Sequence, residues 1–208
     1  MEEILISVIM STFNETLSEL DTSVSSILNQ SHHKIEFIIV DDNPQNIQLK
    51  NYLESIKDER VQIIYNEKNK GLVSSLNIAL KYANGEYIAR MDADDISEPN
   101  RLENQLKFIQ EKSLDFIGCW IKPFNQFEVY KQSFPTKHNS IKFFLRWGNC
   151  IPHPTWLIKK EVYETMDGYR EIARCEDYDF LCRAINAGYK VGNLNEYLLR
   201  YRIRDDSI

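Results

Sequence analysis

Apolar residues along the chain form short, nearly continuous runs, separated by segments in which they recur every three or four residues. These runs lie at residues 4–10, 35–40, 61–65 and 87–91, and each contains a single polar residue. Runs of this length are typical of strands buried on both faces of a parallel sheet. The segments between them, at residues 17–28, 49–56 and 72–83, carry leucine, isoleucine and alanine at helical spacing.

This alternation of strand and helix predicts an α/β fold. Right-handed crossovers between successive strands give a mostly parallel sheet with helices on both faces. The turn at Asn84-Gly85 precedes the strand at 87–91. Pro99 is expected to be the first residue of the next helix, with Ser97 or Glu98 near its cap.

The pattern changes near residue 120, where aromatic residues and prolines become frequent. We expect a helix over residues 175–186 and two closing strands, at 191–194 and 197–203. A chain of 208 residues without a Pro/Gly/Ser-rich linker is suited to a single domain. We therefore predict one domain over 1–208, composed of a first half at 1–119 and a smaller C-terminal half at 120–208.

Composition narrows the functional class. A net charge of −6 argues against nucleic acid as the main ligand. The four cysteines are widely spaced and lack zinc-site spacing, which indicates reduced thiols in a cytoplasmic protein. The apolar run at 4–10 is expected to be a first strand and not a signal peptide, and no run is long enough to span a membrane.

Three carboxylates follow the strand at 87–91, namely Asp92, Asp94 and Asp95. Open α/β sheets bind their ligands at the carboxyl ends of strands. Carboxylates this close repel one another unless a positive charge lies between them, and a divalent cation with oxygen ligands would supply it. A solvated acidic turn at a helix start is the alternative, and these residues alone leave both open.

Polar residues also follow two other strands, at the edge of the sheet where Asp92, Asp94 and Asp95 are expected. Asp41 and Asp42 follow the second strand, and residues 11–15 form a polar loop after the first. Their position favours a ligand site. The aspartates could equally cap the turn before Pro44.

The ordered set of motifs resembles the inverting family 2 glycosyltransferases of bacterial polysaccharide biosynthesis, which have the GT-A fold and use nucleotide-diphosphate sugars. The matching segments are residues 8–14, 26–31, 36–42, 69–72, 77–79, 83–88, 91–95, 101–105, 153–155, 168–169, 176–181 and 198–202. The resemblance implies that 1–119 binds the nucleotide sugar and that 120–208 binds the acceptor.

For the donor, the resemblance implies that Phe13 stacks on a uracil-like ring, that Ser11 contacts the ring edge and that Asp42 accepts a hydrogen bond from the ring N–H. Asp41 and Glu15 would belong to the same nucleotide site. Phe13 as an ordinary core aromatic is the alternative.

At the acidic corner, the resemblance assigns Asp92 to the ribose and Asp94 to a Mn²⁺ or Mg²⁺ ion that bridges the two phosphates. Asp95 would either complete the metal shell through water or cap the following helix, and we favour the cap. Relatives often carry a histidine where this chain has Arg204. Arginine cannot ligate a cation but can pair with a diphosphate, so Arg204 is expected in the nucleotide site.

On the acceptor side, Glu176-Asp177 matches an acidic pair at a helix start. The resemblance implies that Asp177 is the base that deprotonates the acceptor hydroxyl, with Glu176 beside the acceptor. His153, between Pro152 and Pro154, would point into the acceptor pocket. Structural roles are the alternatives: Glu176 would stabilise the helix dipole, and His153 would be a structural histidine.

The expected activity is transfer of a hexose or N-acetylhexosamine, with a UDP-sugar as the expected donor, to a saccharide or lipid-linked saccharide. The competing hypotheses are a nucleotidyltransferase, a receiver-type signalling module, and a catalytically weak or dead nucleotide-sugar binder. We expect a cytoplasmic protein, and the aromatic segment at 143–147 is either a peripheral membrane contact or a buried amphipathic helix.

Overall fold

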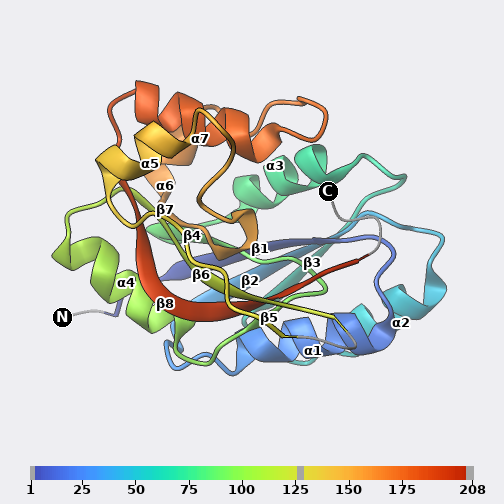
Figure 1. The fold of residues 1–208 in the computed structure, drawn as a ribbon. Coiled ribbons are helices and arrows are strands. Elements are labelled where there is room, and N and C mark those ends of the chain that lie inside the picture. Colours follow the sequence, from blue (N-terminus) through green and yellow to red (C-terminus); the bar gives the residue numbers. More distant parts are fainter. Residues whose placement is uncertain (1–2, 126–128, 205–208) are drawn as a thin grey trace.

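The computed structural model describes residues 3–125 and 129–204, and within these ranges eight strands form one sheet in the order β3-β2-β1-β4-β7-β6-β8-β5 (Figure 1). The strands are β1 (Ile6–Thr12), β2 (Ile35–Asp41), β3 (Val61–Tyr65), β4 (Tyr87–Arg90), β5 (Ile96–Ser97), β6 (Phe116–Phe124), β7 (Leu157–Lys159) and β8 (Val191–Arg202). The helices are α1 (Leu17–Leu28), α2 (Ile47–Ser55), α3 (Leu72–Tyr82), α4 (Arg101–Glu111), α5 (His138–Phe144), η1 (His153–Thr155), α6 (Lys160–Thr165) and α7 (Glu176–Asn186).

The first four strands are parallel, as the alternating pattern predicts. β1 pairs with β2 and with β4, and β2 pairs with β3, all in parallel register. Antiparallel pairing begins in the C-terminal part, where β7 lies between β4 and β6 and β5 pairs with β8. The α/β, mostly parallel fold class is therefore confirmed. The division of the chain into two functional halves stays a prediction, and β6 crosses its boundary.

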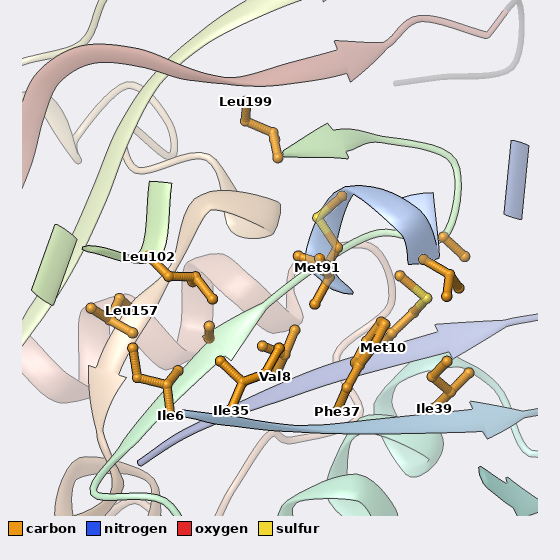
Figure 2. Packing of buried hydrophobic residues seen from close by; sticks show 14 of the residues in the cluster. Ile6, Val8, Met10, Ile35, Phe37, Ile39, Met91, Leu102, Leu157 and Leu199 are labelled. Carbon is orange, nitrogen blue, oxygen red and sulfur yellow. The ribbon is translucent and has the colours of Figure 1, made fainter. Parts of the chain in front are cut away.

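The sheet is covered on both faces, which explains the continuous apolar runs. Successive residues of β1 enter opposite cores: Val8 packs under α1, α2 and α4, whereas Ile9 packs under α3, α6 and α7. Figure 2 shows the first of these cores, with Phe37 of β2 beside Met10. Because each face of the central strands is covered by helices, every position in them favours an apolar residue.

Two expectations about element boundaries are wrong. Helix α4 begins at Arg101 with Asn100 at its N-cap, and not at Pro99. The residues before it are bound to the sheet, because β5 pairs with β8 and the Glu98 N–H donates to the Leu198 carbonyl at 2.9 Å. The helix therefore cannot begin until the chain has left the sheet.

The two predicted closing strands are one strand, β8, in the structure. The polar residues that suggest a break, Asn195 and Glu196, are exposed where the register against β6 shifts. Opposite Cys119 and Trp120 lie Leu194 and Tyr197, so β8 has two extra residues at this irregularity. A bulge keeps the strand continuous while it bends, and the sequence pattern of a bulge resembles that of a turn.

We expect replacement of Phe37 by alanine to lower the free energy of unfolding by about 3–5 kcal/mol, because the ring is fully buried and its loss leaves a cavity. Urea denaturation measures the change. Ile47→Ala is the matched control, since Ile47 is 60% exposed and should change stability by less than about 0.5 kcal/mol. Equal losses in the two variants would contradict the assigned core.

Candidate active site

Four of the predicted site residues line one cavity of about 470 Å³, namely Asp92, His153, Glu176 and Asp177. They come from different elements: Asp92 follows β4, His153 begins η1, and the acidic pair begins α7. Arg90, Asn149 and Tyr201 line the same cavity. Residues that are far apart in the sequence therefore meet at one place, as the ligand site of an open α/β sheet requires.

The carboxylate of Asp177 is held in a fixed orientation. Its Oδ2 accepts a hydrogen bond of 2.6 Å from the Asn149 side-chain amide, and its Oδ1 accepts one of 2.6 Å from the Tyr178 N–H. The side chain lies in the first turn of α7, where the helix dipole favours a negative charge. A partly exposed, oriented carboxylate at the wall of a cavity has the geometry of a general base.

His153 ends a chain of hydrogen bonds that runs into the core. Its Nε2 lies 2.9 Å from the Tyr169 hydroxyl, which lies 2.9 Å from the hydroxyl of Tyr163. The ring also packs edge-on against Trp156, at 4.5 Å between centroids. Burial, together with the charge of Arg90, lowers the pKa of His153 well below its usual value. The imidazole therefore faces the cavity as a neutral group.

The turn that carries His153 is fixed by two polar residues of α4. Arg101 is fully buried and donates to the Pro154 carbonyl at 2.7 Å, and Gln105 donates to the Thr155 carbonyl at 2.7 Å. Burial lowers the pKa of Arg101 to about 10, so the guanidinium keeps its charge at neutral pH. Arg101 and Gln105 lie one helical turn apart, and together they position η1 against the sheet.

Arginines supply the positive charge between the three carboxylates of the acidic corner. Buried Arg90 pairs with Asp92, and Arg204 donates through Nε to Asp94 Oδ2 at 2.7 Å. Arg202 donates through Nε to the Asp94 carbonyl at 2.9 Å. Positive charge that a divalent cation could supply at this corner is thus already present within the protein.

Asp95 does not cap helix α4, contrary to the expectation. It is 1% exposed, and its Oδ1 accepts a hydrogen bond of 2.8 Å from the Arg202 N–H, which ties the corner to β8. Burial, reinforced by the charges of Asp92 and Asp94, raises the pKa of Asp95 well above its usual value. Its role in the structure is to join the strand end to the C-terminal strand.

The corner has the oxygen ligands that a divalent cation prefers, but few of them. Among the described residues, no three His, Cys, Asp or Glu side chains gather in a way that could hold a metal ion. Burial, and then the charge of Asp92, raise the pKa of Asp94, although Arg204 opposes the change. Asp94 fits a cation that takes most of its ligands from a bound diphosphate, because Mg²⁺ is commonly held by one or two carboxylates plus phosphates.

The loop after β1 is built around Glu15, whose carboxylate accepts from the Thr12 hydroxyl at 2.6 Å and from the Phe13 N–H at 2.8 Å. Phe13 is 38% exposed, so the alternative of an ordinary core aromatic is wrong. Ser11 is half-buried at the end of β1, beside Val40 of β2. Asn43 donates to the Phe13 carbonyl at 2.9 Å and joins this loop to the loop after β2.

Asp41 and Asp42 differ in how their carboxylates are used. Asp42 accepts from the side chain of Asn66 at 2.7 Å and from the N–H groups of Lys70 and Gly71, each at 2.8 Å. It therefore organises the loop that leads into α3. Asp41 accepts from the Asn43 N–H at 3.0 Å, while its Oδ2 is buried without a partner, and burial raises its pKa.

Two residues of the cavity, Arg90 and Asn149, are not indicated by the sequence motifs. Arg90 lies within a mostly apolar run, yet it is the buried partner of Asp92 at the cavity wall. An arginine inside an otherwise apolar strand that ends in aspartate is the pattern that could have indicated it. Asn149 has no comparable pattern, because its contact with Asp177 depends on how residues 145–152 fold over α7.

The four cysteines are free thiols, as expected. No helix in the described ranges has both the length and the apolar character needed to cross a bilayer.

Two solved glycosyltransferase structures share this fold. Residues 1–349 of Staphylococcus aureus TarS with UDP-GlcNAc superpose with a TM-score of 0.80 at 21% identity, covering 97% of this chain and 59% of that one. The Pyrobaculum calidifontis mannosyltransferase PcManGT with GDP-Man and Mn²⁺ gives 0.74 at 17% identity, covering 97% and 58%. At these identities the likeness establishes the fold, which is that of the GT-A glycosyltransferases.

Sequence comparison identifies the family. The model for glycosyl transferase family 2 matches residues 7–166. The O-antigen biosynthesis glycosyltransferase WbnJ of Escherichia coli is 37% identical over 210 residues, covering 98% of this chain and 81% of WbnJ. The chain therefore belongs to glycosyl transferase family 2, and its enzyme class is that of a glycosyltransferase. It spans less than two thirds of the solved structures to which it is similar.

We expect stability to fall as the pH drops below about 6.5 because of His153. The unfolded chain binds a proton at the usual pKa of about 6.5, whereas the folded protein, with a lowered pKa, does not. Acidification therefore favours unfolding, by at most about 1.4 kcal/mol per pH unit.

Urea denaturation of wild type and His153→Gln at pH 7.5 and 5.5 measures this dependence. The variant should lose part of the pH dependence, whereas the control His33→Gln, at an exposed histidine, should keep it. An unchanged pH dependence in His153→Gln would contradict a neutral imidazole with a lowered pKa.

Proposed function

We propose that the protein is an inverting glycosyltransferase that moves a hexose or N-acetylhexosamine from a nucleotide-diphosphate sugar, preferably a UDP-sugar, to a saccharide or lipid-linked saccharide. The observation that carries the proposal is the cavity that is lined both by Asp92, which follows β4, and by the oriented carboxylate of Asp177. A base on one side of a cavity and a diphosphate site on the other is the arrangement that displacement with inversion needs.

The nucleoside would bind at the carboxyl ends of β1 and β2. The exposed ring of Phe13 offers a surface on which a base can stack, and Ser11 lies at the same strand end. The Asp42 carboxylate already accepts three hydrogen bonds, and a carboxylate can accept about four. Asp42 would therefore still be able to accept one from the ring N–H. Asp41, whose second oxygen lacks a partner, and Glu15 complete the polar lining.

The diphosphate would lie between the acidic corner and the arginines that compensate it. Asp92 would bind the ribose, and Asp94 would be the protein ligand of a Mn²⁺ or Mg²⁺ ion. When bound, such a cation stabilises the negative charge on the departing diphosphate. Arg204, 2.7 Å from Asp94, would pair with a phosphate oxygen once the diphosphate is present, because its planar guanidinium suits that geometry.

The acceptor would enter from the side of α7 and η1. Asp177 takes the proton of the acceptor hydroxyl as that oxygen forms a bond to the anomeric carbon. The bond from this carbon to the diphosphate oxygen breaks on the opposite face, and its electron pair leaves with the nucleoside diphosphate. Glu176 and neutral His153 line the same wall and would hydrogen-bond the sugars. Polysaccharide assembly at the inner face of a cytoplasmic membrane is the setting that we propose.

A catalytically weak or dead nucleotide-sugar binder is the second candidate. The pairing of Arg204 with Asp94 favours it, because the carboxylate that would bind the cation is already engaged. Binding without turnover distinguishes this candidate from the first.

We expect Asp177→Asn to lower the rate of sugar transfer or donor hydrolysis by about 10²–10⁴-fold, because the amide cannot accept the proton. UDP should still raise the melting temperature of the variant, since binding to the folded state stabilises it by mass action. Release of UDP from UDP-GlcNAc and UDP-glucose, together with thermal unfolding, measures both. Glu111→Gln, at an exposed carboxylate of α4, is the control and should keep the wild-type rate, whereas full activity in Asp177→Asn would refute the assignment of the base.

We expect Arg204→Ala to make nucleotide binding more dependent on the cation. The variant lacks the guanidinium that competes for Asp94, so the gain in melting temperature with UDP should be small without Mn²⁺ and large with it. Asp94→Asn should lose the Mn²⁺-dependent part of the gain. If Mn²⁺ changed none of these melting temperatures, the cation would have no place in the donor site.

A further inference from the structure

Three exposed aromatic side chains lie together on the acceptor side of the molecule, and the proposed chemistry does not use them. Phe143, Phe144 and Trp147 are 50%, 48% and 69% exposed. Their ring centroids lie 5.1–6.1 Å apart, so they form one surface, called here the aromatic patch. Among the described ring pairs, theirs are the ones in which both partners are exposed.

The exposure of the aromatic patch does not result from loose packing of the segment that carries it. Ile141 and Leu145, on the opposite side of the same segment, are 0% and 6% exposed and belong to the core shared with α6 and α7. The Tyr178 hydroxyl donates to the Leu145 carbonyl at 2.7 Å. The segment is therefore firmly seated, and its outward face remains apolar. Isolated exposed apolar residues need no explanation, but a contiguous group of aromatic rings marks an interaction surface.

The side chains around the aromatic patch carry positive charge. Residues 137–147 contain Lys137, Lys142 and Arg146 but no acidic residue, in a chain of net charge −6. All three cations are exposed, and the Arg146 guanidinium carbon lies 5.5 Å from the centroid of the Phe143 ring. Aromatic rings with adjacent lysine and arginine suit the headgroup region of a bilayer with anionic lipids, where the rings enter the interface and the cations meet phosphates.

The aromatic patch is linked directly to the proposed catalytic wall. Asn149 follows Trp147 by two residues and donates to Asp177, and α5 lies with α6 and α7 on the same face of the sheet (Figure 1). A bilayer held at the patch would therefore lie on the acceptor side of the cavity. An acceptor that is itself lipid-linked would be presented to Asp177 from that bilayer.

We infer that the aromatic patch, with Lys142 and Arg146, docks the protein on an anionic lipid bilayer. The docking surface is inferred from contacts and charges that do not depend on the proposed function. Only the presentation of a lipid-linked acceptor rests on that function, so an experiment can refute vesicle binding without refuting UDP binding, and the reverse.

Co-sedimentation of the whole chain with vesicles tests the inference. We expect binding to vesicles of phosphatidylglycerol and phosphatidylcholine in equal parts, and at least tenfold weaker binding to pure phosphatidylcholine. The double variant Phe143→Ser/Trp147→Ser should bind the mixed vesicles at least tenfold more weakly than wild type. Lys142→Gln/Arg146→Gln should bind the mixed vesicles more weakly than wild type at low salt. As the salt concentration rises, its binding should decrease less than that of wild type. Tyr82→Ser, at an exposed aromatic on α3, is the control and should bind like wild type.

Tryptophan fluorescence gives a second measurement that needs no disruptive variant. Trp156 is fully buried and Trp120 is partly buried, so Trp147 is the exposed indole of the three. Mixed vesicles should shift the emission of the wild type to shorter wavelength, and brominated lipid should quench it. The shift should be lost in Trp147→Phe.

Several outcomes would overturn the inference. Absence of binding to mixed vesicles would do so, as would equal binding of wild type and Phe143→Ser/Trp147→Ser. Equal binding to both kinds of vesicle would refute the role of the cations. Formation of a dimer through the aromatic patch, detected by sedimentation velocity and accompanied by no binding to vesicles, would also refute the inference.

Discussion

The ion pairs between arginine and aspartate at the carboxyl end of β4 are the interaction on which the rest of the site depends. Arg90 is fully buried, and an unpaired guanidinium there would be strongly destabilising. Its pairing with Asp92 fixes the strand end that faces the cavity. Arg202 and Arg204 then attach the end of β8 to Asp94 and Asp95, so the corner joins the central sheet to the C-terminal strand.

This compensation changes how a cation can act. Asp94 already has a positively charged partner, so a cation is not needed to hold the carboxylates together. A cation that binds with the nucleotide sugar must compete with Arg204 or coexist with it. In the proposed donor site, exchange of Arg204 for a cation at Asp94 would involve side chains alone, so the strands of the sheet need not move.

The proposed acceptor side is built from elements that the regular alternation of strand and helix does not predict. The turn η1 is held by Arg101 and Gln105 of α4, while Asn149 orients Asp177. The stretch from α5 to η1 therefore contributes both the aromatic patch and Asn149, which orients the proposed base. The proposed docking surface and the orientation of Asp177 thus depend on the same short stretch of chain.

Apolar periodicity determined the parallel strands and their helices, because a strand covered on both faces favours apolar residues at successive positions, as Val8 and Ile9 show. The order of motifs likewise indicated Asp92, His153, Glu176 and Asp177, which the fold brings to one cavity. Only the tertiary structure decided that β8 is continuous, that Asp95 binds Arg202, that Arg204 pairs with Asp94 and that Asn149 orients Asp177. These side-chain contacts join residues that are 28 to 110 positions apart. Local periodicity carries no information about such pairs, because packing of distant elements selects them.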